Sequence, residues 1–324
     1  NYHAISFYPD LTRMEGMTAV VEGHRQELGM EYWVDITPAN MILPEYTLFR
    51  HVELGYSFLR LPDGRYLRLG EPTEGCGVVN ALFAFVTALA VAFGATPVVR
   101  ILAKNVGAID VPKDNRRMHK TPIPRMGGLA IFFGFVVAVL LFSRVSIQMK
   151  SILMGAVVLI VLGVVDDIKP LPALFKLVVQ IGAALIPVSQ GIKVYAVAHP
   201  FVSYDYIRLG AWSVPVTVLW IVGMINAVNF IDGLDGLADG VSTIGALTML
   251  IITLLMGDLK IAIIIAALVG ACVGFMPFNM NPAKIFMGDT GSTFLGFILA
   301  SLSIQGLFKM YAVISFMVPF LILG

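Results

Sequence analysis

Long apolar runs separated by short polar stretches make up most of this chain from residue 77 onward. A helix needs about 20 mostly apolar residues to cross the hydrocarbon core of a bilayer. The pattern therefore predicts an all-α polytopic membrane protein with about nine transmembrane helices. The predicted spans are residues 77–95, 126–143, 149–165, 171–188, 213–228, 240–256, 261–278, 293–307 and 311–324.

Residues 1–76 follow a different pattern and predict a small soluble segment of α+β-like character. Within it, the stretches 56–61 and 66–69 flank a Pro-Asp-Gly-Arg sequence, which is typical of a β-hairpin turn. No catalytic combination of residues stands out in this segment, and its role is left open. We therefore expect two domains, the soluble segment and a polytopic membrane domain at 77–324.

The overall composition agrees with a membrane protein. Of all residues, 58% are hydrophobic and 13% are charged, and the mean hydropathy is +0.85. Soluble domains contain about 25% charged residues. The two cysteines, Cys76 and Cys272, are too few for a cysteine metal cluster or a disulfide framework. Charge is unevenly distributed, because residues 1–76 carry a formal net charge of −5 and the remainder carries +6.

Successive spans cross the membrane in alternating directions, so the connections after the first, third, fifth and seventh spans share one face. They are residues 96–125, 166–170, 229–239 and 279–292, and they contain the polar motifs that stand out. Seven of the 16 basic residues that follow residue 76 lie in the first connection. Cytoplasmic loops of membrane proteins are enriched in Lys and Arg. We therefore expect the four connections to build one site on the cytoplasmic side.

The third connection, together with the end of the span before it, is rich in acids and amides. Placing an acid at the centre of the hydrocarbon costs roughly 2.5–3.5 kcal/mol. We therefore expect this cluster at a helix end that faces water, a metal or a ligand, where Gly233, Gly236 and Gly240 would let backbone amides approach a phosphate. The alternative is a polar connection with no further role. The side chains concerned are Asn226, Asn229, Asp232, Asp235 and Asp239.

Two adjacent acids, Asp166 and Asp167, follow the span at 149–165. Both cannot stay ionised in apolar surroundings without a counter-charge. The pattern predicts that a divalent cation or Lys176, about one turn into the next span, supplies that charge. A polar stop at the end of a helix is the alternative.

The fourth connection places Asp289 near Gly288 and Gly291 at the predicted start of a helix. Mg²⁺ takes oxygen ligands from one or two carboxylates and shares its remaining positions with substrate phosphates. Phe286 could stack on a base, although aromatic residues at a membrane interface often serve as anchors. Acids from three connections and lysines from two indicate Mg²⁺-assisted chemistry on a diphosphate.

The first connection is basic and stiffened by prolines. Its side chains, among them Lys120 and Arg125, suit a polyanionic ligand or acidic lipid headgroups. An ordinary basic loop on the cytoplasmic side is the alternative.

Four motifs now stand in order along residues 77–324 and resemble the polyprenyl-phosphate N-acetylhexosamine-1-phosphate transferases. Residues 122–125 read Pro-Ile-Pro-Arg and residues 229–232 read Asn-Phe-Ile-Asp, which is similar to the WecA/TagO type rather than to the MraY type. The motifs are residues 122–128, the acids 166–167 with Lys176, residues 226–237 and residues 286–292.

This resemblance implies Mg²⁺-dependent transfer of a sugar 1-phosphate, with GlcNAc 1-phosphate as the first expectation, from a UDP-sugar to undecaprenyl phosphate. UMP is released, and the product initiates synthesis of a cell-envelope polymer such as teichoic acid. The family is also sensitive to tunicamycin. The implied location is the bacterial cytoplasmic membrane, with the site on its cytoplasmic face. The resemblance implies no nucleic-acid partner and leaves a homodimer open.

The resemblance also implies roles for individual residues. Asp289 and Asn229 would hold Mg²⁺, for which Mn²⁺ could substitute. Asp166 and Asp167 would serve the acceptor phosphate, and Lys176 would contact phosphates or nucleotide. Direct attack of the acceptor phosphate is the favoured route, and a covalent aspartyl intermediate remains open. The residues expected to bind substrate, with the last three seating the uridine, are Lys120, Arg125, Asn226, Asp232, Asp235 and Phe286.

Two alternatives to this function remain. One is the MurNAc-pentapeptide phosphotransferase of peptidoglycan synthesis, and the other is a membrane transporter. Transporters place their sites near the midplane between repeats, whereas the acids here lie at helix ends. Relative to the family, residues 1–76 are an addition, from a fusion or a gene-start artefact, and the C-terminal part with a His- and Arg-rich loop is missing.

Overall fold

The computed structural model describes four short strands within residues 33–69 and the chain at 74–110, 122–143, 145–198 and 206–306. Its contacts divide the chain into two units, Asn1–Cys76 and Gly77–Gly324. Lys120 and the predicted span at 311–324 lie outside the described residues.

The described part of the first unit is a four-stranded antiparallel sheet in the order β1-β2-β3-β4. Its last two strands pair Ser57 with Leu69 and Arg60 with Tyr66, so the predicted hairpin is confirmed. The strands are β1 (Trp33–Asp35), β2 (Thr47–His51), β3 (Ser57–Arg60) and β4 (Tyr66–Leu69).

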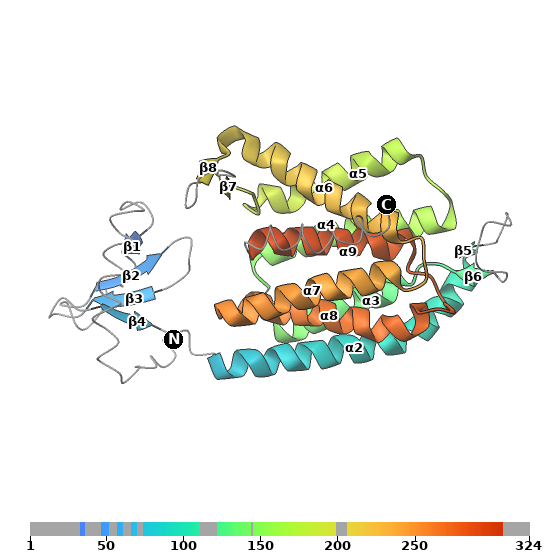
Figure 1. Cartoon of the computed structure of the whole chain (residues 1–324), viewed down its shortest axis with the longest axis horizontal. Helices are drawn as coiled ribbons and strands as arrows, with labels where there is room; N and C mark the ends of the chain where they lie inside the picture. Colours follow the sequence, from blue (N-terminus) through green and yellow to red (C-terminus); the bar gives the residue numbers. More distant parts are fainter. Residues whose placement is uncertain are drawn as a thin grey trace. The chain divides into compact units, whose positions relative to one another are not determined.

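The second unit is a bundle of apolar helices (Figure 1). Two short ribbons accompany them, one of β5 (Ile109–Asp110) with β6 (Ile123–Pro124) and one of β7 (Ala196–Ala198) with β8 (Tyr206–Arg208). A 3₁₀ turn, η3 (Gly210–Trp212), leads into α6. The helices are α2 (Glu74–Asn105), α3 (Gly128–Phe142), α4 (Ile147–Ile168), α5 (Ala173–Ser189), α6 (Ser213–Ile231), α7 (Leu237–Met256), α8 (Leu259–Asn279) and α9 (Gly288–Gln305).

Each predicted span within the described residues coincides with one of these helices. Five of them are long and apolar enough to cross a membrane, at Gly77–Asn105, Ile147–Ile168, Gly210–Ile231, Leu237–Leu255 and Leu259–Asn279. The helices α3 and α5 are apolar but shorter. The prediction of a polytopic helical membrane protein is thus confirmed, with five candidate spanning helices among the described residues, whereas the count of about nine spans is not confirmed.

Helix α9 lies inside the bundle, packed against α3, α4, α6 and α7 (Figure 1). Small residues permit this close packing, as they do at many helix contacts in membranes. A Cβ atom added at Gly296 would lie 2.6 Å from the Ile225 Cα of α6. The buried Phe294 ring meets the rings of Phe132 and Phe135 of α3 edge-on. The helix that carries Asp289 is therefore held on several sides.

The four polar connections that the sequence placed on one face meet at one end of the bundle. Backbone hydrogen bonds join the first to the fourth, from Phe286 N to Pro124 O at 2.8 Å and from Gly127 N to Phe286 O at 2.9 Å. The third connection joins the fourth, because Ala283 N donates to Asp235 Oδ2 at 3.0 Å. For the described residues, the prediction that these connections lie together is confirmed.

Candidate active site

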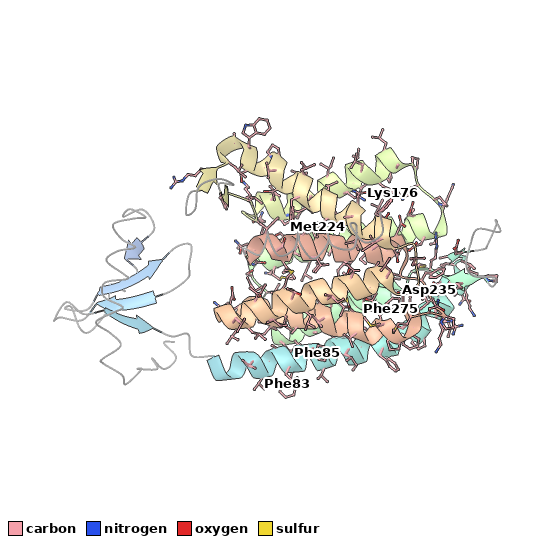
Figure 2. All side chains as sticks on the ribbon, in the orientation of Figure 1. Phe83, Phe85, Lys176, Met224, Asp235 and Phe275 are labelled. Atoms are coloured by element: carbon pink, nitrogen blue, oxygen red, sulfur yellow. The ribbon has the colours of Figure 1, made fainter. Side chains whose placement is uncertain are left out.

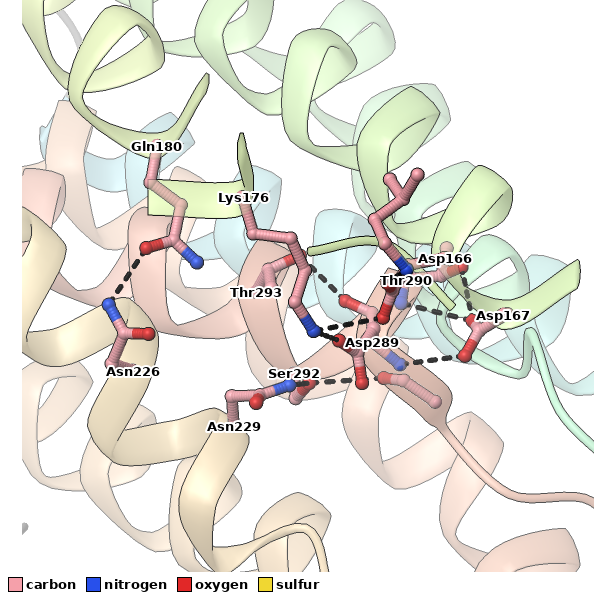
Figure 3. Close-up of polar contacts among 12 residues, drawn as sticks. Asp166, Asp167, Lys176, Gln180, Asn226, Asn229, Asp289, Thr290, Ser292 and Thr293 are labelled. Atoms are coloured by element: carbon pink, nitrogen blue, oxygen red, sulfur yellow. Dashed lines mark hydrogen bonds and ion pairs between the residues drawn. The ribbon is translucent and has the colours of Figure 1, made fainter. Parts of the chain in front are cut away.

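Three helices bring two carboxylates and one lysine together at this end of the bundle. Asp166 lies in the last turn of α4, Lys176 in the first turn of α5, and Asp289 in the first turn of α9. The Lys176 ammonium donates to Asp166 Oδ2 at 3.0 Å and to Asp289 Oδ2 at 2.9 Å (Figure 3). Of the two counter-charges expected for the paired acids, a divalent cation or Lys176, the lysine is the one that bonds Asp166 here.

The short α4–α5 connection creates this geometry. Pro170 and Pro172 disfavour helix at the residues before them, so the chain turns and starts α5 at once. Leu171 N then donates to Asp166 Oδ1 at 2.7 Å. Both oxygens of Asp166 are therefore bonded, one to the turn and one to Lys176.

Asp167 faces a different partner from that of its neighbour, because adjacent residues on a helix point about 100° apart. Its side chain is 7% exposed. Asp289 N donates to Oδ1 at 3.0 Å, while Thr290 N and Thr290 Oγ1 donate to Oδ2 at 3.1 and 2.6 Å. Asp167 thus contacts the backbone that carries Asp289.

Helix α6 adds an amide to the same place. Asn229 Nδ2 donates to Ser292 Oγ at 2.8 Å, and Ser292 Oγ donates to Gly288 O at 3.1 Å (Figure 3). Asn229 therefore lies beside the first turn of α9. One turn earlier on α6, Asn226 Nδ2 donates to Gln180 Oε1 of α5 at 2.8 Å.

The oxygens gathered here are the donor types that a hard divalent cation prefers. Among the residues whose side chains are described, no group of three or more His, Cys, Asp or Glu is placed to hold a metal ion. The oxygen donors that the structure brings together here are the carboxylates of Asp166 and Asp289 and the amide of Asn229. That set suits Mg²⁺, which leaves several positions to water and substrate phosphate. The Lys176 ammonium between the two carboxylates shows that this position favours a cation.

Asp232 lies at the end of α6, where the same acidic cluster affects the pKa of its carboxyl. Loss of hydration, and after it the charges of Asp167 and Asp289, raises the pKa of the Asp232 carboxyl well above its usual range. Asp235 lies in the same connection and accepts the hydrogen bond from Ala283 N. In Figure 2, Lys176 and Asp235 lie toward the same end of the bundle.

Two other residues predicted to bind substrate, Arg125 and Phe286, have contacts in the first and fourth connections. Arg125 Nη2 lies 3.8 Å from Asp110 Oδ1, so this guanidinium is part of an ion pair within the first connection. Phe286 is held by the backbone bonds that join the first and fourth connections.

Three residues of the site had no role in the sequence-based prediction. Thr290 and Ser292 lie within the quoted motif 286–292 but were not singled out. Gln180 is buried and lies four residues after Lys176, hence on the same face of α5. A polar residue at that spacing in an apolar helix was the signal that could have found it.

Several glycines serve the packing of helices around the site. A Cβ at Gly128 would lie 2.1 Å from Gly291 Cα, and one at Gly163 would lie 2.4 Å from Thr290 Cα. At Gly128 and Gly163, α3 and α4 thus approach the backbone of α9 closely. Around Gly233 and Gly240, no atom lies within 4 Å of an added Cβ.

A bundle of apolar helices with carboxylates, an amide and a lysine converging at one end defines an integral membrane protein with a polar site at that end of the bundle. The chain belongs to glycosyl transferase family 4, whose family model matches residues 149–307. The family-level resemblance found in the sequence is therefore confirmed.

Relatives with related names share much of this chain. A probable undecaprenyl-phosphate N-acetylglucosaminyl 1-phosphate transferase of Bacillus subtilis is 42% identical over 248 residues, 76% of this chain and 69% of the relative. A decaprenyl-phosphate N-acetylglucosaminephosphotransferase of Mycobacterium tuberculosis is 39% identical over 250 residues, 71% of this chain and 62% of the relative. A phospho-N-acetylmuramoyl-pentapeptide-transferase of Chloroherpeton thalassium is 31% identical over 284 residues, 74% of this chain and 75% of the relative.

Proposed function

We propose that this protein transfers a sugar 1-phosphate, GlcNAc 1-phosphate in the first instance, from a UDP-sugar to undecaprenyl phosphate and releases UMP. The observation that carries the proposal is the convergence of Asp166, Lys176 and Asp289 at one end of an apolar bundle. A lipid acceptor and a charged nucleotide donor can meet only at such a face. The names of the more similar relatives support N-acetylglucosamine over the muramoyl-pentapeptide donor.

Asp289 and Asn229 are the residues that would hold Mg²⁺ or Mn²⁺, with Asp166 beside them. A divalent cation bound there supplies charge neutralisation to the diphosphate of the donor. Lys176, which bonds both carboxylates, is within reach of any phosphate that enters between them and would add its charge to the reacting group.

The acceptor needs no separate base. A phosphate monoester has a second pKa near 6 and is largely dianionic at neutral pH. One acceptor oxygen would form a bond to the phosphorus that carries the sugar, while the bond from that phosphorus to the bridging oxygen breaks and UMP leaves with the electron pair. The protein's own groups then have to orient the two phosphates and screen their repulsion, which is the main task in phosphoryl transfer.

The basic first connection supports a cytoplasmic location of the site in a bacterial cytoplasmic membrane. UDP-sugars would reach this face from the cytoplasm, and the acceptor phosphate would reach it from the lipid. Asp232, Asp235 and Phe286 remain the residues proposed to seat the uridine, with Lys120, Arg125 and Asn226 also on the substrate side.

One assay tests this function. UMP release is measured with the full-length protein, undecaprenyl phosphate and Mg²⁺, with UDP-GlcNAc and UDP-MurNAc-pentapeptide compared as donors. We expect release from UDP-GlcNAc and its loss in EDTA. Release only from the pentapeptide donor would identify the muramoyl reaction, and no release from either donor would reject the proposal.

A further inference from the structure

We infer that Asp167 is a positioning residue that acts on the site through the first turn of α9 and does not bind the acceptor phosphate. This inference rests on the proposed function and deepens it. It separates Asp167 from Asp166, to which the family resemblance gave the same role.

The first argument is how the oxygens of Asp167 are used. The first four backbone N–H groups of a helix lack partners within the helix. The residue before α9, Met287, offers no side-chain cap. Asp167 supplies the acceptors from α4 instead, since it receives Asp289 N, Thr290 N and Thr290 Oγ1 at 3.0, 3.1 and 2.6 Å. An anion at a helix start is also favoured by the helix dipole.

The second argument is the shape of the contact. Gly288 has a φ of +73°, and a Cβ there would lie 2.5 Å from Asp167 Oδ2. Gly163, one turn before Asp167 on α4, would place a Cβ 2.4 Å from Thr290 Cα. The two glycines let the backbones of α4 and α9 approach until the carboxylate fits against the helix start. The Asp167 carboxylate is therefore placed to bind the start of α9.

The third argument is what this contact controls. Asp289 donates its backbone N–H to Asp167, and its side chain extends to Lys176. The position of the Asp289 carboxylate therefore depends on Asp167 through the main chain of the same residue. Asp167 is buried at 7% exposure with three of about four acceptor positions in use. The oxygens of Asp167 are thus used by the start of α9, whereas those of Asp166 bond Lys176 and the α4–α5 turn.

The variants Asp167→Asn and Thr290→Val test the inference, with Thr290→Ser as the conservative control. Two quantities are measured on the full-length protein in detergent. One is Mn²⁺ affinity by electron paramagnetic resonance without substrates, and the other is kcat and KM for undecaprenyl phosphate from UMP release. Partners of metal ligands typically change affinity or activity by about 10–100-fold when replaced.

For Asp167→Asn we expect Mn²⁺ affinity and kcat to fall about tenfold or more, with the KM for undecaprenyl phosphate within about twofold of wild type. Thr290→Val should change the same two quantities in the same direction, and Thr290→Ser should restore them. The double variant should lose less than the product of the single losses, because both act on one contact.

A rise of tenfold or more in the acceptor KM for Asp167→Asn with unchanged Mn²⁺ affinity would overturn the inference. Wild-type Mn²⁺ affinity in Thr290→Val would also overturn it. If Asp167→Asn fails to fold, Thr290→Val, which keeps the carboxylate, carries the test. The Mn²⁺ measurement needs no turnover, so a wild-type protein inactive on both donors would reject the proposed function and leave the role of Asp167 testable.

Discussion

The Lys176 ammonium lies 2.9 Å from Asp289 Oδ2, although the two residues are 113 positions apart in the sequence. The same ammonium lies 3.0 Å from Asp166 Oδ2. A cation of the chain itself thus joins the carboxylates where we propose that a divalent cation binds. The lysine and the metal would compete for Asp289, and a phosphate that takes up the lysine would favour the metal.

Replacing the lysine by Lys176→Met should therefore raise Mn²⁺ affinity in the absence of substrate, by about tenfold. Two opposite charges about 4 Å apart interact by about 4 kcal/mol near a protein surface. Without the lysine, a metal ion no longer has to replace this attraction when it binds Asp289. Lys176→Arg keeps the charge and should stay close to wild type. Titration followed by electron paramagnetic resonance measures both, and an unchanged or lower affinity in Lys176→Met would contradict the competition.

Asp289→Asn should lower both Mn²⁺ affinity and UMP release about 100-fold, because the amide gives up the charge that attracts a divalent cation. Asp258→Asn is the matched control. Asp258 caps the start of α8 by accepting from Ile261 N at 3.2 Å, and Asn caps helices as well as Asp does. Both variants should unfold at similar temperatures. Normal UMP release from Asp289→Asn would remove this residue from the metal site.

The bond between Gln180 and Asn226 should stabilise the packing of α5 on α6 and thereby the distance from Lys176 to Asn229. Gln180 is buried, so removing the Asn226 amide leaves it without this partner, which costs about 1–3 kcal/mol. Asn226 is exposed and also donates to Val222 O at 2.8 Å, so losing Gln180 costs it less. We therefore expect Asn226→Leu to lower the unfolding temperature more than Gln180→Leu does, and the double variant to lose less than the sum of the two. Unchanged stability in both variants would show that the pair does not hold α5 on α6. A raised KM for UDP-GlcNAc in Asn226→Leu alone would support the proposed place of Asn226 on the substrate side.

Gly163→Ala should destabilise the protein strongly, because the added methyl group meets backbone atoms of Thr290 at 2.4 Å and backbone cannot move aside. Gly182→Ala on α5 is the control, since no atom lies within 4 Å of the added Cβ. That change should be neutral or stabilise the helix by up to about 1 kcal/mol. Thermal unfolding in detergent distinguishes them, and equal midpoints would show that α4 and α9 are packed less closely than described.

Single cysteines at the exposed positions Lys169 and Lys284 should be labelled from the same side of the membrane, and one at Gln190 from the other. Lys169 and Lys284 lie in connections at the site end of the bundle, whereas Gln190 ends α5 at the opposite end. The background would lack Cys76 and Cys272. In intact cells we expect an impermeant thiol reagent to reach only position 190, and labelling of all three would contradict the proposed orientation.

The sequence by itself determined the helices and which of their connections belong together. In lipid each spanning segment must satisfy its own backbone hydrogen bonds, and a helix does so within the segment. The apolar runs at residues 149–165 and 261–278 are therefore expected to be helical. Alternation then places Asp166, Asp289 and Asn229 at one end without knowledge of any contact. Charged residues at run ends located the site because the hydrocarbon excludes them.

Only the tertiary structure decided how these residues divide their roles. Asp166 and Asp167 are equivalent in sequence, but the rotation of α4 turns one toward Lys176 and the other into the start of α9. Lys176 is paired with Asp289, and Gln180 with Asn226, through contacts between segments distant in sequence. Such pairings follow from how close two helices can approach, which here depends on glycines facing the backbone of a helix more than 100 residues away. Apolar periodicity carries no information about that distance.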